Sequence, residues 1–350
     1  MIFTLMRNSS FKRMDVIFST MALVLKKPHQ NINQDRREPT QVSFFRSQII
    51  LFNSRKRHGL LYSVSTIAGL LCIPGILSVM DSETQIHLLI QRTIMLPFIT
   101  SMIAVGMYIL NDLVDVDLDR ANSKNRPIPS GWVSRKQTWS FIILTNAAAV
   151  GMSIATLHLA SIVLVLLMII LGILYSTTRI ALMNRFVLKN IAIASFYVVC
   201  TMLGITSSYG IDIAINNPII PFHTIAVSGI MIFVCSIIND LGDTKGDKRA
   251  GRRTIPIVLG GKNTIELLIV LLSCMPIMSW MLYATFLEHD TIKIMYPIAV
   301  TVVISLALFR MTIIRKVFAN IELMRKQYKK WFPLLMVLQL AVVLVTLFPL

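Results

Sequence analysis

Long apolar runs separated by short polar connections cover most of the chain after residue 59. Nine runs are long enough to cross a bilayer, which takes roughly 18 to 20 apolar residues. They lie at residues 60–80, 92–111, 138–157, 159–177, 187–208, 222–240, 264–286, 293–314 and 331–349. Inside lipid such a segment satisfies its backbone hydrogen bonds by forming a helix. The pattern predicts an all-α membrane protein with nine transmembrane helices, and it leaves no room for a large soluble domain.

The composition agrees with this class. Hydrophobic residues make up 55% of the 350 and charged residues only 15%, and the mean hydropathy is +0.70. Soluble domains average roughly 45–50% apolar residues and about a quarter charged residues. The lipid bilayer is therefore the expected environment of this chain.

The net charge of +17 would also suit a nucleic-acid-binding protein, so the positions of the basic residues decide its meaning. All lysines and arginines except Arg92 and Lys293 fall in five segments: residues 7–57, 115–136, 178–190, 241–263 and 310–330. If the nine helices alternate in direction, these segments share one side of the membrane. Basic loops favour the cytoplasmic side. We therefore expect a multi-pass protein whose N-terminus and these four loops are cytoplasmic, with no nucleic-acid partner.

The first 57 residues carry eleven of the basic residues and no run long enough to span a membrane. Their apolar stretch, residues 16–25, is short and is soon followed by Pro28. An interfacial helix, a disordered basic arm and a targeting peptide remain open for this segment. The predicted division is a basic N-terminal arm, 1–57, and a transmembrane domain, 58–350.

Two copies of the pattern N-D-L-x-D-x-x-x-D end the second and the sixth predicted helices. The first copy contains Asn111, Asp112, Asp115 and Asp119, and the second, 128 residues later, contains Asn239, Asp240, Asp243 and Asp247. The repeat continues downstream, since Arg126 and Arg253 each stand three residues before a proline. A repeat of this length implies two related halves that face each other.

The spacing of the acidic residues indicates a metal site. Offsets of four residues place Asn111, Asp115 and Asp119 on one helix face, and Asn239, Asp243 and Asp247 likewise. Asp112 and Asp240 lie to one side of this stripe, within reach of it, whereas Asp117 points away. Oxygen ligands without His or Cys favour Mg²⁺ or Mn²⁺, and Mg²⁺ often completes its shell with substrate phosphates. Two such helix ends form a clamp for a diphosphate.

Other interpretations of the acidic residues fit less well. A solvated acidic helix end would not require the same spacing twice beside lipid, where acidic residues are costly and usually functional. A calcium loop is excluded because Arg120 and Arg126 occupy the positions that need glycine and glutamate.

These motifs resemble those of the UbiA-type intramembrane prenyltransferases. The family's N-D-x-x-D-x-x-x-D is met from Asn111 to Asp119, and its sequel, a basic residue and R-P-x-P-S-G, by Lys124 and residues 126–131. The second motif, D-x-x-D-x-x-G-D-x-x-x-G-x-x-T-x-P, runs from Asp240 to Pro256. Tyr175-Ser176 is typical of the fourth helix, although Arg179 replaces the family's usual lysine. The resemblance covers about 58–349.

The resemblance implies nine helices around a central cavity that opens to lipid, with the two aspartate-rich loops as a cytoplasmic cap. It implies a Mg²⁺-dependent transferase that ionises a polyprenyl diphosphate, geranylgeranyl-like, and passes the prenyl group to a membrane-embedded acceptor. The expected metal ligands are Asn111, Asp112, Asp115, Asp119, Asn239, Asp240, Asp243 and Asp247, of which Asp115, Asp119, Asp243 and Asp247 are the catalytic residues. The expected diphosphate-binding residues are Asn111, Lys124, Arg126, Tyr175, Arg179, Lys189, Asn239, Lys245 and Arg253. Tyr108 and Tyr175 are candidates to face the allylic cation through cation–π attraction.

The acceptor stays open at this stage. The strings R-P-I-P-S-G and G-D-K-R-A-G-R-R-T-I-P-I are most similar to the archaeal-type enzymes that prenylate geranylgeranylglyceryl phosphate. A quinone-type aromatic acceptor and a membrane terpene cyclase without an acceptor are alternatives on the same scaffold. A divalent-cation carrier is the alternative from another class, because acidic residues at helix ends can also mark an ion path.

Overall fold

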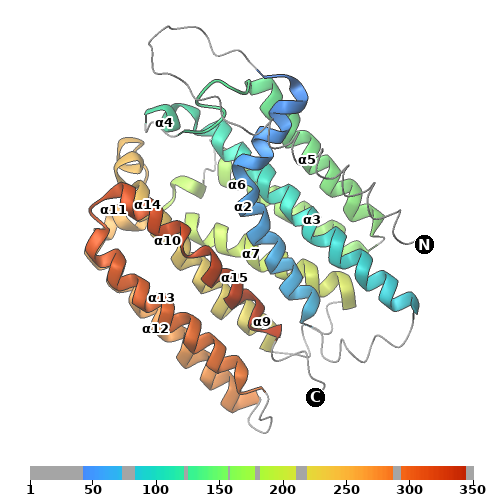
Figure 1. The fold of residues 1–350 in the computed structure, drawn as a ribbon, viewed down its shortest axis with the longest axis vertical. Helices are drawn as coiled ribbons and strands as arrows, with labels where there is room; N and C mark the ends of the chain where they lie inside the picture. Colours follow the sequence, from blue (N-terminus) through green and yellow to red (C-terminus); the bar gives the residue numbers. More distant parts are fainter. Residues whose placement is uncertain are drawn as a thin grey trace, which may run out of the picture. The chain divides into compact units, whose positions relative to one another are not determined.

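The computed structural model describes residues 42–72, 83–121, 125–156, 158–177, 182–209, 219–286 and 293–343, all within one compact unit, Thr40–Leu350. These residues form helices, and among them strand pairing is limited to one isolated bridge between Arg185 and Arg253 (Figure 1). The helices are α2 (Phe44–Leu71), α3 (Glu83–Val114), α4 (Val116–Ala121), α5 (Arg135–Ala155), α6 (Leu159–Ser176), η2 (Leu182–Asn184), α7 (Phe186–Tyr209), α9 (Ile219–Phe222), the π-helix η3 (His223–Gly229), α10 (Ile230–Arg249), α11 (Ile255–Leu259), α12 (Gly261–Phe286), α13 (Met295–Val317), α14 (Ile321–Lys329) and α15 (Phe332–Leu340).

The all-α membrane class is confirmed. Among the described residues seven helical segments are long and apolar enough to cross a membrane. The first is Gln91–Val114 and the last is Met295–Val317. They correspond to the second through eighth predicted spans. The first and last predicted spans begin in α2 and α15 and continue into residues outside the described ranges.

The N-terminal arm is only partly within the described residues. α2 begins at Phe44, so residues 44–57, which we assigned to the arm, form the first half of that helix. Residues 1–41 lie outside the described ranges.

Both acidic motifs lie on helices instead of in cap loops. The first motif begins in α3 and ends in α4, with one turn residue, Asp115, between the two helices. The helical hydrogen bonds continue across this turn. Asp115 N–H donates to the Asn111 carbonyl at 2.9 Å, and Asp119 N–H donates to the Asp115 carbonyl at 2.8 Å. The second lies within α10. The unbroken helical spacing keeps Asn111, Asp115 and Asp119 aligned.

Two glycines allow α2 and α7 to approach closely. A Cβ on Gly69 would lie 2.1 Å from the Thr201 carbonyl oxygen, and one on Gly204 would lie 2.2 Å from the Thr66 carbonyl oxygen. Small residues at helix contacts are a common source of packing within membranes, where lipid offers no hydrophobic driving force. This contact fixes α2, which carries part of the functional site, against α7.

We expect Gly204→Ala to lower the melting temperature of the purified protein, because the neighbouring atom is backbone and cannot rotate away. Overpacking of this kind costs about 1–3 kcal/mol. Gly151→Ala is the matched control, because a Cβ there meets nothing within 4 Å. It should be neutral or slightly stabilising, since alanine favours helix over glycine by about 1 kcal/mol. Equal melting temperatures for the two variants would contradict the close contact.

Candidate active site

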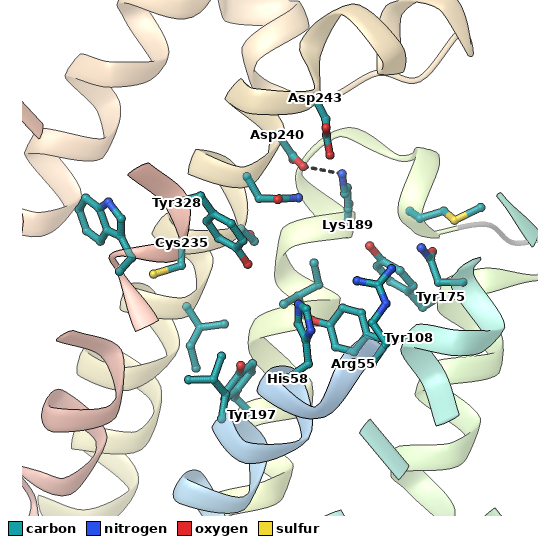
Figure 2. A pocket seen from close by; sticks show the side chains of 18 of the residues that line it. Arg55, His58, Tyr108, Tyr175, Lys189, Tyr197, Cys235, Asp240, Asp243 and Tyr328 are labelled. Carbon is teal, nitrogen blue, oxygen red and sulfur yellow. Dashed lines mark hydrogen bonds and ion pairs between the residues drawn. The ribbon is translucent and has the colours of Figure 1, made fainter. Parts of the chain in front are cut away.

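A polar cavity of about 150 Å³ lies where both acidic motifs meet the middle of α2 and the α14–α15 junction. Its walls come from α2, α3, α6, α7, α10, α14 and α15. Figure 2 shows Asp240 and Asp243 above Lys189, with Arg55, His58 and Tyr108 on the other side of the same space. Segments far apart in sequence therefore converge on one polar site.

In the first motif the four residues divide into two pairs. Asn111 and Asp115 line the cavity, whereas Asp112 and Asp119 are buried behind it. Asp112 accepts from Arg126 Nη1 at 2.7 Å and from Arg55 Nε at 2.8 Å, and Asp119 accepts from the same Arg126 Nη1. In this structure Asp112 and Asp119 therefore bind the arginines that border the cavity.

Asp117 lies outside the site, as its spacing predicted. Its side chain is 87% exposed and is 3.6 Å from Arg120 on the same helix. The helical spacing therefore separates Asp117 from Asp115, although the two residues are only two positions apart.

All four residues of the second motif, Asn239, Asp240, Asp243 and Asp247, line the cavity. Asp240 is buried and accepts from Lys189 Nζ at 2.5 Å (Figure 2). It also accepts from Asn190 Nδ2 at 3.2 Å. Asp243 lies 2.8 Å from Arg325 Nη2 of α14. The two halves of the repeat are therefore not equivalent, because the first places two of its acids behind the cavity.

Arg252 joins the two motifs directly. Its Nη2 donates to Asp115 Oδ1 at 2.5 Å, and its Nη1 lies 3.4 Å from Asp247 Oδ1. Gly251 makes this possible: its φ of +68°, a conformation that favours glycine, turns the chain so that Arg252 N–H bonds the Asp247 carbonyl at 2.9 Å. Burial favours a lower pKa for the guanidinium, but attraction to Asp115 and Asp247 outweighs it and raises the pKa, so Arg252 stays charged.

Two predicted diphosphate-binding residues lie outside the cavity lining. Arg253, chosen because it repeats the position of Arg126, is exposed, and its neighbour Arg252 enters the cavity instead. Lys245 is also exposed and does not line the cavity. A linear repeat could not anticipate this, because the turn at Gly251 decides which of two adjacent arginines faces inward.

The remaining predicted residues are placed as follows. Arg126, Tyr175 and Lys189 line the cavity, and Tyr108 stands beside them. Lys124 and Arg179 lie outside the described residues.

Several lining residues had no sequence signal. Arg55 comes from the segment assigned to the arm and His58 is the first residue after it. Tyr328 and Phe332 come from a basic loop and a final span without a motif. Only Arg252 could have been suspected, since it stands next to a residue that the repeat selected.

A smaller apolar pocket of about 50 Å³ adjoins the polar cavity and shares Tyr108, Asn111, Tyr175 and Ile193 with it. Its other walls are Tyr62, Met107, Leu171, Ala192 and Phe196. An anionic group in the cavity and an apolar chain in the pocket could therefore belong to one ligand.

The donor atoms of the cavity fit a hard divalent cation. They are carboxylate and amide oxygens of Asn111, Asp115, Asn239, Asp243 and Asp247, the ligand type that Mg²⁺ prefers. Asp247 Oδ2 is buried without a hydrogen-bond partner among the described residues, which is costly unless a ligand satisfies it. Within the described ranges no three acidic, histidine or cysteine side chains are already grouped around one point, because basic side chains hold the carboxylates.

The fold and the site define an integral, multi-pass, all-α membrane protein with one polar cavity built from two acidic helical motifs. The profile of the UbiA prenyltransferase family matches residues 70–319, and the chain belongs to this family. The predicted resemblance is confirmed.

Two archaeal relatives share one name. The chain is 28% identical over 195 residues to the digeranylgeranylglyceryl phosphate synthase of Methanosphaera stadtmanae, and 29% identical over 197 residues to that of Thermococcus gammatolerans. Each alignment covers 55% of this chain and 65% of the relative. The chain thus matches slightly less than two thirds of each relative's length.

Solved structures share the fold. A digeranylgeranylglyceryl phosphate synthase structure superposes with a TM-score of 0.59 at 19% identity, covering 87% of this chain and 99% of the other. A UbiA homologue from Archaeoglobus fulgidus gives a TM-score of 0.59 at 18% identity, covering 85% and 99%.

Proposed function

We propose that this chain is a Mg²⁺-dependent intramembrane prenyltransferase that ionises a polyprenyl diphosphate and transfers the prenyl group to an acceptor. The observation that carries the proposal is that Arg252 bonds both Asp115 and Asp247, one residue from each acidic motif, beside the cavity that both motifs line. An apolar pocket adjoins that cavity and suits a prenyl chain. The related Archaeoglobus fulgidus homologue has been solved with GPP and Mg²⁺ bound, which supports the same ligand class here.

The residues of the cavity have separate roles in this proposal. Asn111, Asp115, Asn239, Asp243 and Asp247 hold Mg²⁺, with Mn²⁺ as an alternative, and the chemistry supplied by the bound metal is neutralisation of the departing diphosphate. Lys189, Arg252 and Arg126 bind diphosphate oxygens, since charged donors form the stronger hydrogen bonds. Asp112 and Asp119 position Arg126 from behind.

The reaction breaks the C–O bond between the prenyl group and the diphosphate, and the bonding electrons leave with the diphosphate. The apolar pocket holds the prenyl chain away from water, and Tyr108 and Tyr175 face the allylic cation. A lone pair of the acceptor forms the new bond to the prenyl carbon, and the acceptor's proton passes to the released diphosphate or to water.

The acceptor that we favour is geranylgeranylglyceryl phosphate, because the relatives described above are named digeranylgeranylglyceryl phosphate synthase. Two alternatives predict different products. A membrane terpene cyclase would release diphosphate and a cyclic hydrocarbon without an acceptor, and a divalent-cation carrier would transport metal into vesicles without releasing diphosphate.

The test uses the purified full-length protein with geranylgeranyl diphosphate and geranylgeranylglyceryl phosphate, and follows diphosphate release and product mass. Activity should vanish in a chelator and return with Mg²⁺ or Mn²⁺, because carboxylates alone repel a diphosphate. Full turnover in the chelator would contradict the proposed metal site, and metal uptake without diphosphate release would favour the carrier.

We also propose that the N-terminus and the acidic helix ends face the cytoplasm, and that the first and last predicted spans complete a bundle of nine. The concentration of basic residues on that side supports this orientation. Tags inserted at 244–262 should react only with cytoplasmic reagents, and tags at 210–217 only with reagents on the opposite side. Labelling of both tags from one side would contradict the topology.

A further inference from the structure

A second cavity, which we call the vestibule, adjoins the polar cavity. It measures about 670 Å³ and is lined by residues 53–58 of α2, by Asn125 and Arg126, by Asn239 and Asp243 of α10, and by the α14–α15 junction. It shares Arg55, His58, Arg126, Asn239, Asp243, Tyr328 and Phe332 with the polar cavity. A ligand in the vestibule would therefore reach the reaction site.

The vestibule is strongly basic. Its lining includes Arg55, Lys56, Arg57, Arg126, Arg325 and Lys329, against a single acid, Asp243. Arg55 and Arg126 bind Asp112, and Arg325 binds Asp243. Lys56, Arg57 and Lys329 have no ion-pair partner in the part of the chain that the structure describes. Three cations thus remain for an anionic ligand.

These cations are separate from those that serve the diphosphate. Of the cations assigned to the diphosphate, Lys189 and Arg252 line the polar cavity alone, and Arg126 borders both cavities. The vestibule alone is lined by Lys56, Arg57, Arg325 and Lys329. One diphosphate beside Lys189 and Arg252 leaves the vestibule set unused. Two cationic groups at one reaction site indicate two anionic ligands.

A buried nitrogen marks the junction of the two cavities. His58 Nδ1 is buried without a hydrogen-bond partner among the described residues. The centroid of its ring lies 4.1 Å from that of Tyr108, with the two rings tilted by 38°. Burial, and then the charges of Arg55, Arg126 and Arg57, lower the pKa of His58 to about 3, so the imidazole is neutral. A polar group of a ligand that passes from the vestibule towards the polar cavity would satisfy this nitrogen.

We infer that the vestibule is the acceptor site and that Lys56, Arg57 and Lys329 bind a phosphate group on the acceptor, so that the acceptor is a phosphate-bearing lipid alcohol. This inference rests on the proposed prenyl transfer. It favours a phosphate-bearing acceptor over neutral aromatic molecules, because these cations would not strengthen the binding of a neutral molecule. Lysine and arginine are the usual protein partners of phosphate.

The test compares geranylgeranylglyceryl phosphate with geranylgeranylglycerol, the same lipid without its phosphate, in nanodiscs of neutral lipid. The wild-type protein should prefer the phosphate by at least tenfold in kcat/KM. In Lys56→Gln/Lys329→Gln the KM for the phosphate acceptor should rise roughly tenfold, the size expected from losing charged hydrogen bonds. The KM for geranylgeranyl diphosphate should change less than twofold.

Lys316→Gln/Lys330→Gln is the matched control. It removes the same charge from exposed positions near α14 that do not line the vestibule, and it should behave like the wild type. Equal use of both acceptors by the wild type would overturn the inference, as would a rise confined to the KM for the prenyl diphosphate. Absence of diphosphate release with any acceptor would instead overturn the proposed function.

A competition experiment with inorganic phosphate distinguishes a lipid headgroup from a free anion as the ligand of the vestibule. Inorganic phosphate at the concentration of the acceptor should inhibit transfer only weakly, because the acceptor's lipid chains hold its phosphate in place. A non-reactive prenylglyceryl phosphate at the same concentration is the reference inhibitor. If inorganic phosphate inhibits transfer to the phosphate acceptor equally strongly, the vestibule is a free-phosphate site and its assignment to the acceptor fails.

Discussion

Asp115→Asn and Asp243→Asn are each expected to reduce diphosphate release by about three orders of magnitude. Each change removes a negative oxygen from a different motif, and both motifs face the same cavity. Loss of one preorganised group that stabilises developing charge typically costs about 10²–10³ in rate, and loss of a metal ligand adds to this. Diphosphate release measured at saturating prenyl diphosphate checks the prediction.

The double variant should be little worse than either single variant, because residues that act as a unit have non-additive effects. Asp117→Asn is the control: its side chain is 87% exposed and outside the cavity, so activity should stay near the wild-type level. Equal loss in Asp117→Asn would disprove the helical-face argument. Normal turnover in Asp243→Asn would make the second motif structural.

Arg252→Gln is expected to lower diphosphate release by about a hundredfold, because one charged donor to the leaving group is lost. It should also lower the melting temperature in a chelator, because Asp115 and Asp247 then face each other without the cation between them. Arg252→Lys should restore only part of either property, because an ammonium cannot place two donors as a planar guanidinium does. Rate and melting temperature together separate a chemical role from a purely structural one.

Arg253→Gln is the matched control for Arg252→Gln, with the same change one position along the chain. Its side chain is exposed and does not line the cavity, so rate and stability should stay close to the wild type. A large loss in Arg253→Gln with normal activity in Arg252→Gln would show that the repeat, and not the turn at Gly251, identifies the functional arginine.

The sequence predicted the features that follow from local chemistry. Apolar length located the membrane helices, because a continuous apolar run of about 20 residues satisfies its own backbone in lipid as a helix. The four-residue spacing placed Asn111 and Asp115 towards the cavity and Asp117 away from it, as the structure has them. It also placed Asp119 with them, but Asp119 is buried behind the cavity against Arg126. Periodicity gives the face of one helix and not what packs against it.

The features that were not predicted depend on contacts between distant segments. Asp112 was assigned to the metal, yet it binds Arg55, which lies 57 positions earlier in the chain. Asp243 binds Arg325, 82 positions later. Neither partner belongs to a motif, and in a chain with 34 basic residues no local pattern distinguishes these two from the others.

The pairing of carboxylates with arginines and lysines would make binding of the proposed substrate an exchange of counter-ions. Asp115, Asp240 and Asp243 each already contact a cation of the same chain, Arg252, Lys189 and Arg325 respectively. Charges buried without a partner would be very costly in a membrane. In the proposed reaction, metal and diphosphate therefore redistribute existing partners, with carboxylates passing to the metal and basic side chains to the phosphate. The same ion pairs that keep these carboxylates neutralised within the folded protein also supply the cations for the diphosphate.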